Sequence, residues 1–167
     1  PVAVAAAARP LGIEIDPDRL TREVPAYRDG VSMFDVQNWL MAAGMRSIVI
    51  NGDDGVVVPL VDGGIAPVAV QRGQHGSHAV VVHGYSADLS SLAPGMPKLT
   101  AICITDPRDG SRRSLSLPEW DSTRSEAFLI IMPENDRIEA QLSARGFDLD
   151  SALRQNARFR AEEWLIR

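Results

Sequence analysis

The chain has 167 residues, of which 45% are hydrophobic and 23% charged, the composition of an ordinary globular domain with one core. Its formal net charge is −5 and no dense Lys/Arg cluster is present, which argues against a nucleic-acid partner. The longest apolar runs, such as residues 79–82, are far shorter than the roughly 20 residues of a membrane-spanning helix, so no span is expected. The single cysteine, Cys103, excludes an internal disulfide and fits a reducing, cytoplasmic compartment.

The N-terminal part of the chain has the signals of three helices. Residues 2–8 are alanine-rich and favour a helix that Pro10 and Gly12 end. Asp16 followed by Pro17 is typical of an N-cap and first helical position, so a second short helix is expected up to about Val24.

The third helix has the clearest signals. Ser32 is expected to cap it, Asp35 stands three residues later as in a capping box, and Gly44 ends it. Its inward-facing residues are expected to be Met33, Val36 and Leu40.

The middle of the chain changes from helical spacing to β-branched runs separated by turn formers. Six strands are expected, at residues 46–50, 66–71, 78–85, 99–105, 114–117 and 127–132. Helices followed by strands predict an α+β fold with a largely antiparallel sheet.

The chain becomes helical again after Pro133. We expect one domain over residues 1–133 and a helical extension over 134–167, with helices at 138–142 and from about 148 or 150 to 164. The apolar positions of the last helix that lie near one face are Leu149, Leu153, Ala157 and Trp164. This face is expected to pack on the sheet, with contact to a partner protein as the alternative.

Two residues carry the most informative chemistry, His78 and Asp106. His78 opens a strand after a glycine-rich loop, so its imidazole is held by the strand and still reaches solvent. Asp106 ends the next strand and is followed by Pro107, where its carboxylate can accept the imidazole N–H and fix the tautomer. The pattern predicts a general base with its orienting partner.

The other two histidines are expected to lie outside this pair. Strand alternation places His83 on the opposite face from His78, so a core or surface role is its default. His75 lies in the loop, and together with His78 and Asp106 it forms only a weak candidate for a zinc site. No metal or other cofactor is therefore expected.

Cys103 is a poor candidate for a nucleophile. It lies three residues before Asp106 on the same expected strand, and this odd spacing directs the two side chains to opposite faces. In its apolar run, residues 99–105, it is expected to behave as a small buried hydrophobic residue.

Three segments in this order resemble the double-glycine leader peptidases. These papain-like cysteine peptidases, family thirty-nine, process bacteriocin precursors. The segments are Ser-His-Ala-Val-Val-Val-His-Gly-Tyr at 77–85, Ile-Thr-Asp-Pro-Arg-Asp-Gly at 104–110 and Leu-Ser-Leu-Pro-Glu-Trp at 115–120. In that family the histidine opens a Gly-His-x-Val-Val strand, where His78 stands, and the aspartate opens an Asp-Pro-x-x-Gly turn, where Asp106 stands. The resemblance covers about residues 1–133 and implies a papain-like fold in which Trp120 packs in the core.

The resemblance also implies a nucleophile that this chain does not contain. In the family a Cys-Gly pair begins the first helix, preceded by the glutamine of the oxyanion hole, and residues 1–9 are similar to the helical segment after that pair. The nucleophilic cysteine is therefore expected just upstream of Pro1. A thiol at a helix N-terminus beside an imidazolium has a depressed pKa, so the thiolate would attack the peptide bond.

Three functions remain open from the sequence. The first is a cysteine peptidase or related acyl-transfer domain that acts on a peptide or protein substrate through His78 and Asp106. The second is a non-catalytic domain that binds a peptide in the same groove. The third is an unrelated α+β domain in which both residues are structural.

Overall fold

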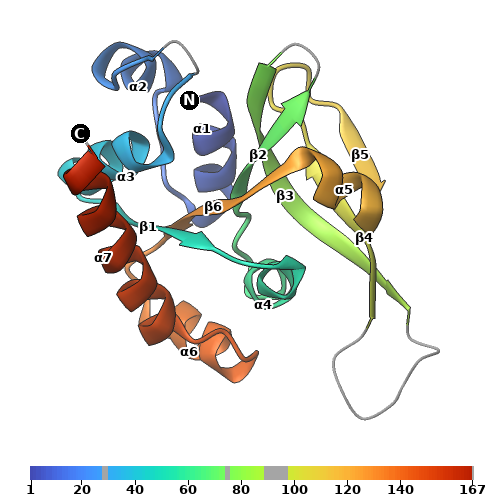
Figure 1. The fold of residues 1–167 in the computed structure, drawn as a ribbon. Helices are drawn as coiled ribbons and strands as arrows, with labels where there is room; N and C mark the ends of the chain where they lie inside the picture. Colours follow the sequence, from blue (N-terminus) through green and yellow to red (C-terminus); the bar gives the residue numbers. More distant parts are fainter. Residues whose placement is uncertain (28–29, 74–75, 89–97, 167) are drawn as a thin grey trace.

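The computed structural model describes residues 1–27, 30–73, 76–88 and 98–166, and Figure 1 shows its layers. Its helices are α1 (Val2–Ala8), α2 (Pro17–Glu23), α3 (Met33–Ala42), α4 (Val57–Asp62), α5 (Leu117–Thr123), α6 (Asp136–Ala144) and α7 (Leu149–Ile166), with short 3-10 turns η1 (Arg9–Leu11) and η2 (Asp54–Val56). Its strands are β1 (Arg46–Asn51), β2 (Val68–Gly73), β3 (Gly76–Asp88), β4 (Lys98–Thr105), β5 (Arg112–Ser116) and β6 (Arg124–Met132).

In the described part of the chain the six strands form one antiparallel sheet with the order β1-β6-β2-β3-β4-β5. The expected α+β class with a largely antiparallel sheet is confirmed. The last strand, β6, lies between β1 and β2, so it joins the N-terminal part of the chain to the β-rich part. This long-range insertion is not visible in local sequence patterns.

The sheet has an apolar core on each face, and strand alternation assigns residues to them. The first face carries Ile48, Ile50, Val80 and Val82 and is covered by α4 to α7. The second face carries the intervening positions, such as Val49 and Val81, and is covered by α1 to α3. Because both faces are covered, β1, β3 and β6 contain nearly continuous apolar runs.

The N-terminal helices follow their predicted caps. The side chain of Asp16 accepts a hydrogen bond from the backbone N–H of Asp18, and that of Ser32 accepts one from Phe34. Gly44 adopts the left-handed conformation with φ of 79°, which glycine reaches without strain, just after α3. The inward residues of α3 include Val36 and Leu40 as predicted, and Met33 packs at their edge.

Two helices were not expected from the sequence. In α4 the valines and Pro59 have low helix propensity, yet Val57 and Leu60 are completely buried on the first face. In α5 Pro118 lies in the first turn, a helix-start signal, and Trp120 is fully buried as predicted. Tertiary burial, rather than local propensity, therefore accounts for α4.

The C-terminal helices pack on the sheet. Leu142, Phe147 and Ala152 join the core of the first face, Arg46 of β1 forms an ion pair with Glu139 of α6, and the side chain of Asn156 accepts a hydrogen bond from the backbone N–H of Val49 at 2.8 Å.

The apolar stripe expected on α7 was wrong in one position. Ala157 is exposed, whereas Ala152 and Asn156 are buried beside Leu149 and Leu153. The side chain of Trp164 lies outside the described residues. No helix in the described ranges is long and apolar enough to cross a membrane.

Candidate functional site

His78 and Asp106 are positioned by neighbouring strands. His78 is the third residue of β3, and Asp106 directly follows β4, whose Thr105 is the pairing partner of Val81. The buried residues Val80, Ile102 and Ile104 share their parity, so both polar side chains lie on the first face, at the end of the sheet where β3 begins.

The two side chains are in contact. Nε2 of His78 lies 3.1 Å from Oδ2 of Asp106, a distance that fits an ion pair. Nε2 is shielded from solvent and makes no well-directed hydrogen bond. The separation of Nε2 and Oδ2 therefore suits a hydrogen bond, but the angle between the two groups does not. Hydrogen bonds of catalytic pairs are commonly misaligned until a substrate binds. The predicted proximity is therefore present, and a catalytic role for the pair stays a prediction.

The burial of the pair is unequal. The Asp106 side chain is 8% exposed and the His78 side chain 23% exposed. Since Nε2 itself is shielded, solvent reaches other parts of the imidazole. Nδ1 is then the ring nitrogen that is not directed at Asp106, and it is the one available to a reacting group.

Asp106 is held by its own turn. One oxygen, Oδ1, accepts hydrogen bonds from the backbone N–H of Arg108 at 3.0 Å and from Nε of Arg108 at 3.3 Å. The other, Oδ2, accepts one from Nη2 of Arg108 at 3.2 Å. The side-chain hydrogen bonds from Arg108 lower the pKa of Asp106, helped by the backbone N–H of Arg108 and the charge of His78 and opposed by burial. Asp106 is thus an anion at neutral pH.

Gln71 is a neighbour that the sequence reasoning missed. It is the pairing partner of His78 on β2 and is only 6% exposed. Its Oε1 accepts a hydrogen bond from Nη2 of Arg113 at 3.3 Å, and its Nε2 donates to Oγ1 of Thr123 at 3.4 Å. Gln71 stands two residues after the buried Ala69 on β2, so strand alternation places both side chains on the same face; this spacing could have indicated from the sequence that Gln71 is buried.

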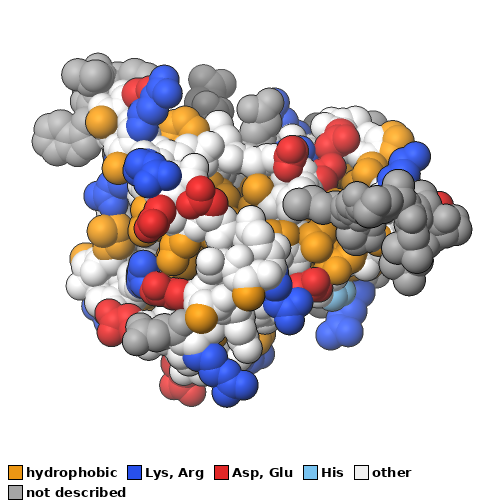
Figure 2. All heavy atoms as spheres, turned by 90° about the horizontal axis from the view of Figure 1, so that it is seen from below, with side chains coloured by type: hydrophobic (Ala, Val, Ile, Leu, Met, Phe, Trp, Pro, Cys, Tyr) orange, Lys and Arg blue, Asp and Glu red, His pale blue; other side chains and the backbone are white. Residues whose placement is uncertain are grey.

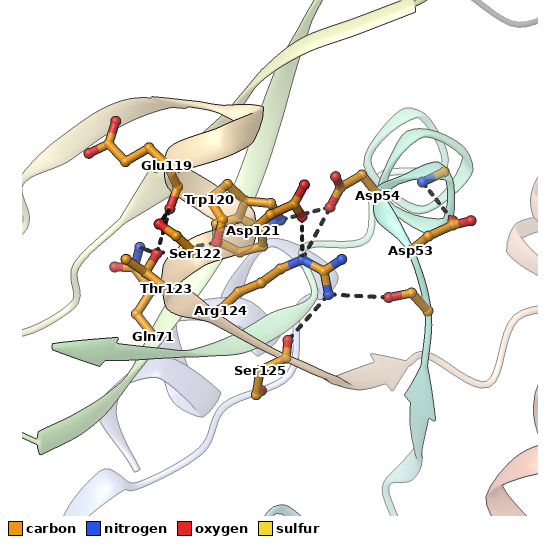
Figure 3. Close-up of polar contacts among 12 residues, drawn as sticks. Asp53, Asp54, Gln71, Glu119, Trp120, Asp121, Ser122, Thr123, Arg124 and Ser125 are labelled. Atoms are coloured by element: carbon orange, nitrogen blue, oxygen red, sulfur yellow. Dashed lines mark hydrogen bonds and ion pairs between the residues drawn. The ribbon is translucent and has the colours of Figure 1, made fainter.

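A second polar cluster connects α5 and β6 with the turn after β1 (Figure 3). Oδ1 of Asp54 accepts a hydrogen bond from Nε1 of the buried Trp120 at 2.8 Å. Nε of Arg124 lies 3.3 Å from Asp54 and 3.3 Å from Asp121. Burial raises the pKa of Asp54, against the opposing hydrogen bond from Trp120 and the charge of Arg124. Through Thr123 this cluster adjoins Gln71.

The opposite face of β3 and β4 holds His83 and Cys103. His83 is exposed, with Nδ1 3.1 Å from Oγ1 of Thr105, and burial followed by the charge of Arg112 lowers its pKa. Cys103 is partly exposed with its Sγ 3.8 Å from Oγ of Ser114, so its expected full burial was wrong. The expected separation of Cys103 from Asp106 is confirmed. His75 lies outside the described residues.

The first helix lies near the same end of the sheet. α1 packs its buried alanines against β2 and β3, on the second face with Val81. In Figure 1 the N-terminus and the start of β3 lie at the same end. A group placed ahead of Pro1 would therefore have to approach His78 around the end of the sheet, and not across it.

Charge is mixed on the surface seen from below. Figure 2 shows acidic and basic side chains interspersed on this face, with hydrophobic side chains between them. In the described residues no group of three or more His, Cys, Asp or Glu residues is arranged to hold a metal ion.

Comparison with known structures identifies the architecture. No protein-family model matches the chain, and no curated protein matches it significantly. The peptidase domain of Streptococcus ComA, a bifunctional ABC transporter involved in a quorum-sensing pathway, superposes with a TM-score of 0.57 at 16% identity, over 79% of this chain and 88% of that one. The peptidase domain of Streptococcus mutans ComA in complex with a small-molecule inhibitor matches with a TM-score of 0.46 at 19% identity, over 72% of this chain and 96% of that one. The chain therefore shares the α+β fold of the ComA peptidase domain.

Proposed function

We propose that this chain is a papain-like cysteine peptidase domain of the double-glycine leader peptidase type, in which His78 is the general acid and base and Asp106 orients it. The observation that supports this most is the 3.1 Å approach of Nε2 of His78 to the ionised carboxylate of Asp106. The pair comes from two neighbouring strands at one end of the sheet, on a fold shared with the ComA peptidase domain.

The proposal assigns each proton. A thiolate ahead of Pro1 attacks the carbonyl carbon of the peptide bond, and the C–N bond breaks as His78 gives the proton on Nδ1 to the leaving amine. Water then attacks the thioester, His78 accepts its proton, and the thiolate leaves as the carboxylic acid forms. Asp106 stays ionised throughout and stabilises the imidazolium, which is present before the first transfer and again after the second.

The proposed thiol would belong to a residue ahead of Pro1. Cys103, the one cysteine of the chain, lies on the opposite face of the sheet from His78, so it is not suited to the role. The α1 helix, which would come directly after the thiol, contacts both β2 and β3. Because these contacts lie on the second face, the thiol would have to reach His78 around the end of the sheet where β3 begins.

We further propose that residues 1–133 form the peptidase domain and residues 134–167 an extension. The change from the β-rich part of the chain to two helices after Pro133 supports such a division. Because Leu142, Phe147 and Ala152 lie in the core of the first face, the extension is expected to stabilise the domain. A partner contact would then use the outer, charged side of α7.

A non-catalytic peptide-binding domain is the second candidate. It is favoured by the position of Cys103, since the described residues place no cysteine on the face of His78 and Asp106. This candidate predicts binding of peptides without cleavage. The two candidates make different predictions for the residues shortly before Pro1: the peptidase requires a cysteine there, and the binding domain does not.

The experiment determines the residues encoded before Pro1 and expresses the chain with them. Hydrolysis of peptides with small residues at the cleavage point, abolished by iodoacetamide, is expected. His78→Ala should lower kcat/KM by roughly 10²–10⁴-fold, the usual contribution of a general acid and base. His83→Ala, on the same strand but the opposite face, is the matched control and should retain activity. Binding without turnover in the extended chain would favour the non-catalytic domain, and full activity of His78→Ala would refute the assignment.

A further inference from the structure

One oxygen of Asp106 is shared between His78 and Arg108. Oδ2 is 3.1 Å from Nε2 of His78 and 3.2 Å from Nη2 of Arg108. The remaining oxygen, Oδ1, accepts the Nε and the backbone N–H of Arg108. Arg108 therefore binds the carboxylate through Nε and Nη2 of its planar guanidinium, a bidentate geometry that fixes the plane of the carboxylate.

The turn that carries Arg108 is itself held by hydrogen bonds. The backbone N–H of Asp106 donates to the carbonyl of Ser111 at 2.9 Å, and that of Gly110 donates to the carbonyl of Asp106 at 2.9 Å. Gly110 has φ of 72°, a left-handed conformation that other residues adopt only with strain. The Asp109 side chain closes the turn by accepting the backbone N–H of Ser111 at 2.8 Å. The Arg108 side chain thus contacts Asp106 from a backbone that the turn holds in one conformation.

The Arg108 side chain is 66% exposed, so it contributes little to the core. An exposed arginine that makes two contacts to a carboxylate which is only 8% exposed suggests a role in orientation. Its guanidinium also adds a positive charge beside the oxygen that faces His78. The other charged groups of this region are Asp109 on the same turn and Arg113, which reaches Gln71 on the far side of His78.

We propose that Arg108 is a positioning residue of the site: it fixes the plane of the Asp106 carboxylate so that Oδ2 stays directed at Nε2 of His78. This inference rests on the proposed function, in which Asp106 orients His78, and adds that Arg108 orients Asp106. It can be tested separately, because the effects of Arg108 on Asp106 and on the His78 imidazole are measurable in the chain without any peptide cleavage.

The test compares Arg108→Ala and Arg108→Lys with Arg112→Ala as a matched control. Arg112 is an exposed arginine at the start of β5, on the face of His83. A pH titration of the Asp106 carboxyl carbon by NMR should show its pKa rising toward the ordinary range in Arg108→Ala, because the hydrogen bonds from Arg108 lower it. Arg108→Lys keeps the charge without the fork, so it should restore the pKa only in part. Arg112→Ala should leave it unchanged.

A second readout reports orientation. The ring nitrogen resonances of His78, assigned with His78→Gln, should show one tautomer with a protected Nε2–H in the parent chain, and faster exchange of that proton in both Arg108 variants. In a chain that cleaves peptides, both variants should lower kcat by up to about 100-fold, the cost of a misplacement near 1 Å, with KM changed less than about twofold. Identical Asp106 and His78 signals in Arg108→Ala and Arg112→Ala would overturn the inference. Absent hydrolysis with the predicted NMR changes would overturn the proposed function and retain the role of Arg108.

Discussion

Replacing Asp54 with alanine tests whether the polar cluster of Figure 3 stabilises the packing of α5 and β6 against the turn after β1. Asp54 belongs to the turn after β1, whereas Trp120 and Arg124 belong to α5 and β6. The alanine variant leaves Nε1–H of the fully buried Trp120 without its acceptor, at a cost of about 1–3 kcal/mol. It also removes one of the two carboxylates at Arg124, whose side chain is 11% exposed, which adds about 1 kcal/mol.

The expected fall in the free energy of unfolding is therefore about 2–4 kcal/mol, measured by urea denaturation with an unchanged m-value. In thermal unfolding this corresponds to a decrease in Tm of roughly 5–15 °C for a chain of this size. Asp54→Asn keeps an oxygen that can accept the Trp120 N–H, and since burial raises the pKa of Asp54, the loss of its charge should cost only about 1 kcal/mol.

A double-mutant cycle with Trp120→Phe isolates the hydrogen bond. The phenylalanine has no N–H, so Asp54→Ala should cost at least about 1 kcal/mol less in that background. A change below about 0.5 kcal/mol for Asp54→Ala alone, or equal costs in both backgrounds, would refute this reasoning.

Burial and charge lead to three further expected outcomes. Leu40→Ala should lower the free energy of unfolding by about 2–5 kcal/mol in urea denaturation because Leu40 is completely buried, and a smaller loss would place α3 less firmly on the sheet. Cys103→Ala should change stability by less than about 0.5 kcal/mol and leave any peptide hydrolysis intact, since Cys103 is partly exposed on the face away from Asp106. The pKa of Asp106 in the folded chain is below its ordinary value of 3.8, so the ionised carboxylate stabilises the fold above that pH, and this stabilisation is lost as the pH falls through the folded-state pKa. Asp106→Asn should therefore flatten the plot of the free energy of unfolding against pH between about pH 5 and pH 2. An unchanged slope would contradict the lowered pKa.

Local signals in the sequence were sufficient for the capped helices and most strands. Asp16 with Pro17 and Ser32 with Asp35 predicted the starts of α2 and α3, because capping depends on residues within one turn. The positions of His78 at the start of one strand and Asp106 at the end of the next predicted their proximity, and strand alternation predicted that Cys103 lies on the other face from Asp106. These features depend on short-range geometry, which a single sequence contains.

Other features depend on tertiary packing and were missed. The α4 helix forms from the poor helix formers Val57 and Pro59 because Leu60 enters the core, and the position of β6 between β1 and β2 is decided by contacts across most of the chain. Cys103 was expected to be buried because its neighbours are apolar, yet the face on which it lies is open beside Ser114. The hydrogen bonds of Gln71 join β2 to α5 and β5, so no local pattern predicts them.

The register between β3 and β4 links the core to the candidate site. Val81 pairs with Thr105, which places Asp106 opposite Val80 and diagonal to His78. A slip of one residue would turn Asp106 to the other face and at the same time expose Ile102 and Ile104, which are completely buried. The apolar residues that stabilise this strand pair therefore also set the 3.1 Å approach of His78 to Asp106, so the geometry of the pair is as strongly determined as the core itself.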